Sequence, residues 1–95
     1  MLHTNVYKEL FKYKQMNSPK GLAQYYLQLE YIKRMFTRKK IFVLTEYEAK
    51  EVYLWNLEFK NKPAFTKIIE DFEEILDQVG LLDKIVNEDV TGSTV

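Results

Sequence analysis

The stretch that decides the fold is SPKGLAQYYLQLEYIKRMF, residues 18–36. Ser18 can cap a helix, because its side-chain oxygen can accept a hydrogen bond from a free backbone N–H, and Pro19 suits the first helical position. Apolar side chains then recur every three or four residues, as they do on the buried face of a helix, at Leu22, Tyr25, Tyr26, Leu29, Ile32 and Phe36. We predict a helix from Pro19 to about Arg38.

A shorter amphipathic pattern precedes this helix. We predict that it starts at Thr4 or Asn5, either of which can act as the N-cap, and that it stops before Asn17. Its apolar residues follow the same spacing, at Val6, Tyr7, Leu10, Phe11 and Tyr13.

A third strong pattern follows the break at Asn61-Lys62-Pro63. Gly80 is well placed to end this helix in the left-handed conformation. Leu81 and Leu82 should then fold back onto its last turn. The apolar stripe consists of Phe65, Ile68, Ile69, Phe72, Leu76 and Val79.

The middle of the chain is ambiguous. Residues 40–45 contain a short run of strand-forming side chains and could be a strand or a buried linker. Thr45 and Glu48 have the spacing of a capping box, which predicts a helix from residue 46 to about residue 60. Against this, residues 55–60 alternate between apolar and polar, as a strand does, so a strand at 52–60 remains the alternative. Residues 83–90 could add a short helix or strand.

These patterns predict an all-α fold, a small bundle of about four helices with up-down topology and at most a minor β element at 40–45 or 52–60. We expect one helical domain over residues 1–90 and a mobile C-terminal tail over residues 91–95. In an up-down bundle the second and fourth helices would be parallel, and their C-terminal ends would lie together.

The composition argues against several classes of function. The chain has no cysteine and one histidine, and its longest apolar runs are four residues. We therefore expect no disulfide, no catalytic, metal-binding or cofactor-binding residues, no membrane-spanning helix and no small-molecule substrate. We expect a cytoplasmic protein that is not an enzyme. Lysine outnumbers arginine twelve to two, which with abundant Tyr, Phe, Ile and Asn suggests a phage or other mobile element of a low-GC host.

Charge is divided sharply along the chain although the formal net charge is zero. Residues 1–44 carry a net charge of +7 and residues 45–95 carry −7. The densest basic group, which we call the basic cluster, is a candidate nucleic-acid-binding site and consists of Lys33, Arg34, Arg38, Lys39 and Lys40. The alternative is structural, since cations at a helix C-terminus are favoured by the helix dipole. The densest acidic group lies at residues 70–77, and we interpret it as a solvated face.

Aromatic residues, fourteen in all, exceed what a core of this size can hide. Tyrosine and arginine are common anchors of protein interfaces. We therefore predict a protein-binding surface that combines exposed aromatics with charges from both clusters, at Tyr31, Arg34, Arg38, Tyr47, Tyr53, Glu73, Glu74 and Asp77.

The resulting hypothesis is a non-enzymatic protein–protein interaction module, a small regulator, inhibitor or assembly factor, whose partner is another protein or a second copy of itself. The alternative is nucleic-acid binding through the basic cluster at residues 33–40. The structure can distinguish the two hypotheses, because nucleic-acid binding requires that acids from the fourth helix leave the basic cluster uncovered.

Overall fold

The structure, a computed structural model, describes residues 3–91, with the backbone alone at 3–5 and 88–91. This part of the chain forms five α-helices and no strand. The all-α prediction is confirmed, and neither 40–45 nor 52–60 forms the β element that the sequence left open. Residues 92–95 of the predicted tail lie outside the described residues. The helices are α1 (His3–Met16), α2 (Pro19–Lys39), α3 (Glu46–Leu57), α4 (Pro63–Gln78) and α5 (Leu82–Thr91).

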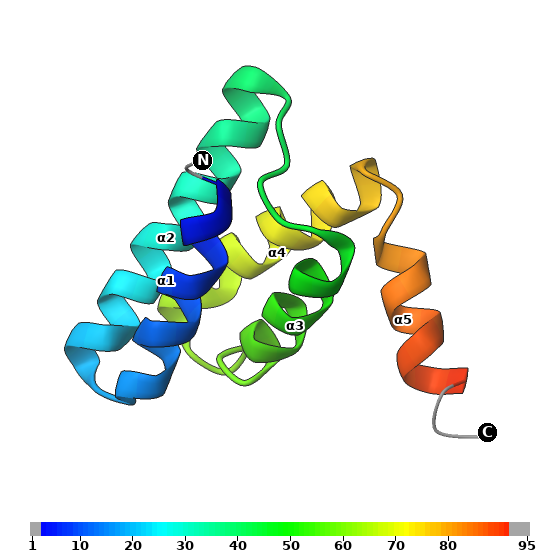
Figure 1. Ribbon diagram of the computed structural model, residues 1–95. Coiled ribbons are helices and arrows are strands. Elements are labelled where there is room, and N and C mark those ends of the chain that lie inside the picture. Colours follow the sequence, from blue (N-terminus) through cyan, green and yellow to red (C-terminus); the bar gives the residue numbers. More distant parts are fainter. Residues whose placement is uncertain (1–2, 92–95) are drawn as a thin grey trace.

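The first four helices surround a common core. α2 packs against α1 and α4, and α3 packs against the same two helices from the other side. α5 packs against α4 (Figure 1). The seam between α2 and α4 and the seam between α1 and α3 therefore involve different pairs of helices.

A regular up-down arrangement is not confirmed, because α4 crosses α2 obliquely (Figure 1). The two helices nevertheless run in the same general direction. The rings of Tyr26 and Phe65 are 5.4 Å apart near the two starts, and Lys33 bonds to Asp71 at 2.7 Å further along.

The helix boundaries confirm several local predictions. Ser18 Oγ accepts a hydrogen bond from Gly21 N at 3.1 Å, as an N-cap does. The capping box is complete, with Thr45 N donating to Glu48 Oε1 at 3.0 Å and Glu48 N donating to Thr45 Oγ1 at 3.2 Å. Gly80 has a φ of 80°, and Leu81 N donates back to Leu76 O at 2.8 Å, so α4 ends in a Schellman motif.

Three predicted boundaries were wrong. α1 starts at His3, so Thr4 and Asn5 lie inside the helix and do not cap it. α3 ends at Leu57 instead of about residue 60, because the chain turns there, with Phe59 N donating to Asn56 O at 2.9 Å. This turn brings the Phe59 ring onto Phe65, at 5.1 Å. The last helix, α5, takes in Thr91, which we had placed in the tail.

Gly21 allows α1 and α2 to approach closely. A Cβ atom at this position would lie 2.7 Å from both Tyr13 O and Met16 Cβ. Real Cβ atoms do not approach backbone oxygens this closely, so the hairpin of α1 and α2 requires glycine here.

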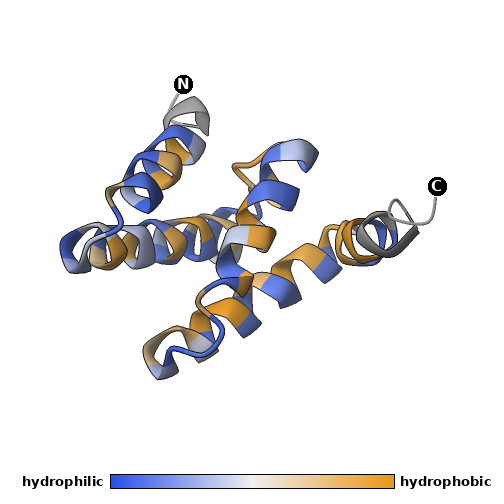
Figure 2. Cartoon of the chain, turned by 90° about the horizontal axis from the view of Figure 1, so that it is seen from below, coloured by the Kyte–Doolittle hydropathy of each residue, from blue (hydrophilic) through white to orange (hydrophobic). Residues whose placement is uncertain are grey.

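Among the side chains that the structure describes, the core is apolar except at one point. Figure 2 shows hydrophobic residues on the inward sides of the helices, and Leu10, Leu29, Ile32, Ile68 and Leu76 are among those almost completely buried. The exception is Asn56, of which 1% is exposed, and its Oδ1 accepts a hydrogen bond from the buried Tyr25 hydroxyl at 2.7 Å. Burial raises the pKa of Tyr25 far above its usual value, with a smaller contribution from Glu58, so the hydroxyl stays a donor.

We predict that Tyr25→Phe lowers the free energy of unfolding by about 1–3 kcal/mol, because the Asn56 amide then loses its partner in the interior. The double variant Tyr25→Phe/Asn56→Leu should recover most of this loss, since it removes both polar groups. Urea unfolding followed by circular dichroism measures both. A double variant as unstable as the sum of its two single variants would contradict the interpretation.

Candidate functional site

An apolar groove lies between the start of α2 and the start of α4. Its volume is about 520 Å³, which is within the range of ligand and peptide sites. We call it the α2–α4 groove, and it is lined by Pro19, Leu22, Ala23, Tyr26, Leu27, Ala64 and Phe65.

The groove is open because small side chains line parts of its walls. Ala23 and Ala64 are exposed and leave room, while the Tyr26 and Phe65 rings meet edge to face at 5.4 Å. Leu27 follows Tyr26 by one residue, so it projects about 100° away from Tyr26 around the helix. Its side chain is 58% exposed, which is more than the exposed fraction of Met16, Ile41 or Val86, the other large aliphatic residues at the surface of the described part.

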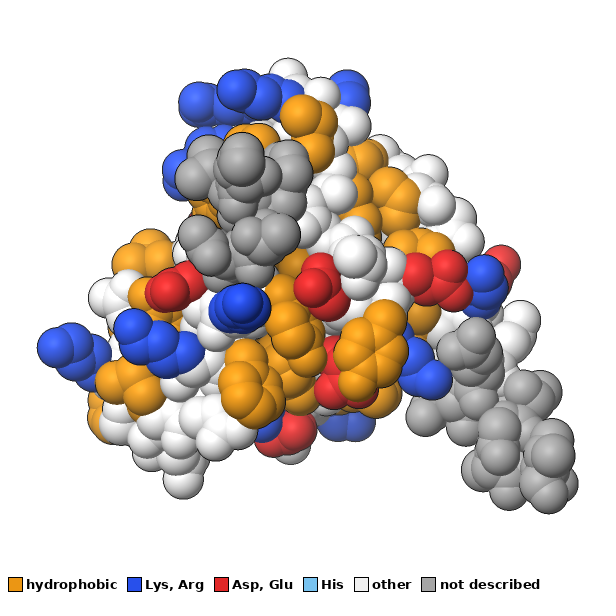
Figure 3. Space-filling view, in the orientation of Figure 1, with side chains coloured by type: hydrophobic (Ala, Val, Ile, Leu, Met, Phe, Trp, Pro, Cys, Tyr) orange, Lys and Arg blue, Asp and Glu red, His pale blue; other side chains and the backbone are white. Residues whose placement is uncertain are grey.

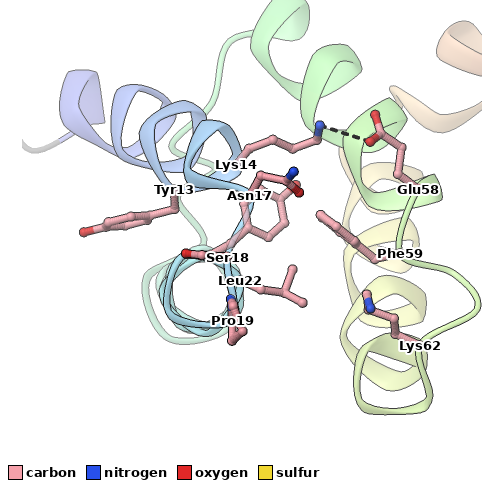
Figure 4. Close-up of a pocket in the computed structure, with 10 residues that line it drawn as sticks. Tyr13, Lys14, Asn17, Ser18, Pro19, Leu22, Glu58, Phe59 and Lys62 are labelled. Carbon is pink, nitrogen blue, oxygen red and sulfur yellow. Dashed lines mark ion pairs between the residues drawn. The ribbon is translucent and has the colours of Figure 1, made fainter.

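A second hollow, the end pocket, lies beside the groove and shares Pro19 and Leu22 with it. Its volume is about 450 Å³, and it is bounded by the α1–α2 turn and the α3–α4 turn. Figure 4 shows Leu22 and Phe59 pointing toward each other across it. An ion pair between Lys14 Nζ and Glu58 Oε1, at 3.1 Å, joins α1 to the end of α3 at its edge.

The charges around the groove are mostly positive. Lys20, Lys60 and Lys62 are exposed and lie within a few residues of the lining side chains. Glu58, an acid of the neighbouring end pocket, is already paired with Lys14. Because Pro19 and Pro63 begin α2 and α4, the positive ends of two helix dipoles also lie here. The groove therefore combines an apolar lining with a basic rim.

The basic cluster lies at the other end of α2. Lys33 Nζ is 2.7 Å from Asp71 Oδ2, and Lys40 Nζ lies 5.9 Å from the centre of the Phe36 ring. Arg34, Arg38 and Lys39 are exposed, and no acid among the residues whose side chains are described lies within ion-pair distance of them. The acids of α4 thus reach only one member of the cluster.

The residues that we predicted to bind protein are spread over three helices. Tyr31, Arg34 and Arg38 are on α2, with Tyr31 half-buried. Tyr47 and Tyr53 are on α3, where Tyr47 is 67% exposed and Tyr53 packs partly against the core.

The predicted acids are on α4. Glu74 and Asp77 are exposed, and Glu73 is half-buried. Glu74 faces Lys33 and Lys40 across a shallow depression without an ion pair between them.

Asp71 is the acid that joins α4 to α2. It was part of the acidic group in the sequence but not among the predicted binding residues. Only 12% of its side chain is exposed, and burial by itself would raise its pKa. Hydrogen bonds from Lys33 and Lys67, both at 2.7 Å, outweigh this and hold the pKa of Asp71 below its usual value.

We predict that Asp71→Asn lowers the free energy of unfolding at pH 7 by about 1 kcal/mol. Because the pKa of Asp71 is lowered in the folded protein, its contribution is complete above the unfolded-state pKa of about 3.9 and is lost as the pH falls through the lower folded-state pKa. Urea unfolding from pH 7 to about pH 3 should therefore show the two proteins converging in stability. A constant difference over that range would argue against the ion pair as its source.

Sequence reasoning missed the groove. It assigned Leu22, Tyr26 and Phe65 to buried stripes, whereas Leu22 and Tyr26 are half-buried and line an opening. One signal was present, since Leu27 is an apolar residue on the side of the helix that the stripe predicts to be exposed.

Comparison with protein-family models, with curated proteins and with solved structures finds no match for the chain. Within the described part, no helix has the length and apolar character needed to cross a membrane.

Proposed function

We propose that this chain is a non-enzymatic protein-interaction module that binds an amphipathic helix of another protein in the α2–α4 groove. The observation that carries the proposal is the groove itself, an apolar opening with a volume of about 520 Å³ in which Leu27 is 58% exposed. Concentrated apolar exposure of this kind is costly in water and is typical of protein-binding sites. Helix-in-groove recognition is the mode that fits an apolar opening between two helices.

The charge around the groove defines the partner further. A helix that presents leucine-like side chains to the groove would place its flanking residues over Lys20, Lys60 and Lys62. Acidic flanks would be attracted by these lysines and by the N-termini of α2 and α4. The proposed partner is therefore an amphipathic helix with acidic flanks.

In this role the chain would act as a small regulator, inhibitor or assembly factor. Its residue usage supports a phage or other mobile element of a low-GC host as the source, and the cytoplasm as its location. A module that occupies a helix of its target can block or organise that target without catalysis of its own.

We predict that a fluorescent 18-residue helical peptide with leucines at i, i+3, i+4 and i+7 and glutamate flanks binds the protein, whereas the same peptide with lysine flanks does not. Leu27→Glu should weaken binding at least tenfold, or about 1.4 kcal/mol, because it places a charge in the apolar groove. Fluorescence anisotropy measures the affinity. Ile41→Glu is the matched control, because Ile41 is also exposed but lies outside the groove. Equal binding of the two peptides, or equal loss in both variants, would contradict the proposal.

The second candidate function is nucleic-acid binding through the basic cluster. The observation in its favour is that Arg34, Arg38 and Lys39 are exposed and without ion-pair partners among the described side chains. Cations in this state can contact phosphates without first breaking an internal pair. The cluster is small, and the acids of α4 lie near it, so we place this candidate second.

If this candidate is correct, single-stranded or duplex oligonucleotides should bind in about 50 mM salt, and the affinity should fall steeply as salt is added, because the contacted phosphates release counterions. Arg34→Glu/Arg38→Glu should reduce the affinity at least tenfold. Lys60→Glu/Lys62→Glu has the same change in net charge at the other end of the molecule and should have a much smaller effect. If no DNA or RNA binds at low salt, this candidate is eliminated.

A further inference from the structure

The seam between α1 and α3 carries a cluster of aromatic rings at the surface. Trp55 of α3 contacts two rings of α1, with ring centres 5.5 Å from Tyr7 and 5.9 Å from Phe11. Phe11 is 46% exposed, and Tyr47 near the start of α3 is 67% exposed. Figure 3 shows hydrophobic side chains along this face of the molecule. Tryptophan, tyrosine and phenylalanine together on a surface are typical of the centre of a protein interface.

The two sides of this seam differ in charge. Lys8 and Lys12 are exposed on α1, each one residue after a ring of the seam, which places them on the outer side of α1. Glu51 and Glu48 precede Trp55 by one and two helical turns, so they lie on the same side of α3 as Trp55. Burial has the largest effect on the pKa of Tyr7 and raises it, and the charges of Glu51 and Glu48 raise it further. These two carboxylates therefore lie near Tyr7, beside the seam.

α1 and α3 run in the same direction along the seam. Phe11 meets Trp55 and, one turn further, Lys14 pairs with Glu58. By this register Glu51 is level with Tyr7, one residue before Lys8. Because Lys8 lies on the outer side of α1 and Glu51 is on α3, Tyr7 lies between the two. No ion pair between them is present in the described part of the chain.

A face with a basic side, an apolar centre and an acidic side is complementary to itself. Two copies that face each other can be related by a two-fold axis parallel to the seam. The rotation exchanges the basic side with the acidic side, and each residue stays at the same level along the seam. Lys8 of one copy would then face Glu51 of the other, and the aromatic clusters would pack against each other at the axis. A purely acidic or purely basic partner would match only one side of the face.

We propose that the chain forms a two-fold symmetric homodimer through this α1–α3 face. The formal net charge of zero means that two copies do not repel each other at long range. The α2–α4 groove involves the other pair of helices, so both copies in the dimer keep it open. The proposal therefore goes beyond the proposed function and does not depend on it.

The test is the mass of the protein in solution, measured by sedimentation equilibrium from about 1 to 300 µM. The wild-type chain should pass from 11.4 kDa to about twice that mass as the concentration rises. Phe11→Ser should weaken the dimer at least tenfold, and because Phe11 is already exposed, circular dichroism should show an unchanged fold. Leu27→Glu, in the groove, is the matched control and should leave the dimer intact.

A charge exchange tests the arrangement of the two copies. Lys8→Glu and Glu51→Lys should each weaken the dimer several-fold, because each creates two like-charge contacts across the axis. The double variant Lys8→Glu/Glu51→Lys restores opposite charges at both contacts and should recover wild-type affinity. A chain that stays monomeric at 300 µM, a mass that grows beyond the dimer, or a double variant no better than the single ones would overturn the proposal.

Discussion

The Tyr25 side chain joins three parts of the chain that are far apart in the sequence. Its hydroxyl donates to Asn56 at the end of α3, and its ring lies 5.4 Å from Phe59 and 6.5 Å from Phe65. The surroundings are apolar, so this hydrogen bond has no solvent to replace it and is costly to leave unmade. The bond therefore restricts how α2 can rest on the end of α3 and the start of α4.

The α2–α4 groove and the end pocket both depend on this arrangement. Phe65 is part of the cluster around Tyr25 and also lines the α2–α4 groove, while Phe59 lines the end pocket. Part of each lining, Phe65 in the groove and Phe59 in the end pocket, is thus held against the core. A groove whose walls are already ordered loses less conformational entropy when a partner binds, which leaves more of the apolar contact for affinity.

Features set by neighbouring residues could be predicted from the sequence, and features set by distant contacts could not. Ser18, the Thr45–Glu48 capping box and Gly80 act within a few residues, and all three have the predicted roles. The groove depends on the oblique crossing of α2 and α4, which no local pattern encodes. Periodicity alone therefore placed Leu22 and Phe65 correctly on inward faces but could not show that the space beside them stays open.

The division of charge along the sequence has a limited structural role. Two ion pairs of the described residues, Lys14–Glu58 and Lys33–Asp71, join a base of the first half to an acid of the second half and so connect α1 to the end of α3 and α2 to α4. Ion pairs at or near the surface contribute about 0–1 kcal/mol each, too little to hold the fold, but they disfavour packings that bring like charges together. Other charges lie at the groove rim and on the two sides of the α1–α3 seam. There they surround apolar surfaces, so apolar contact would supply most of the affinity for a partner, and charge would select the partner and its orientation.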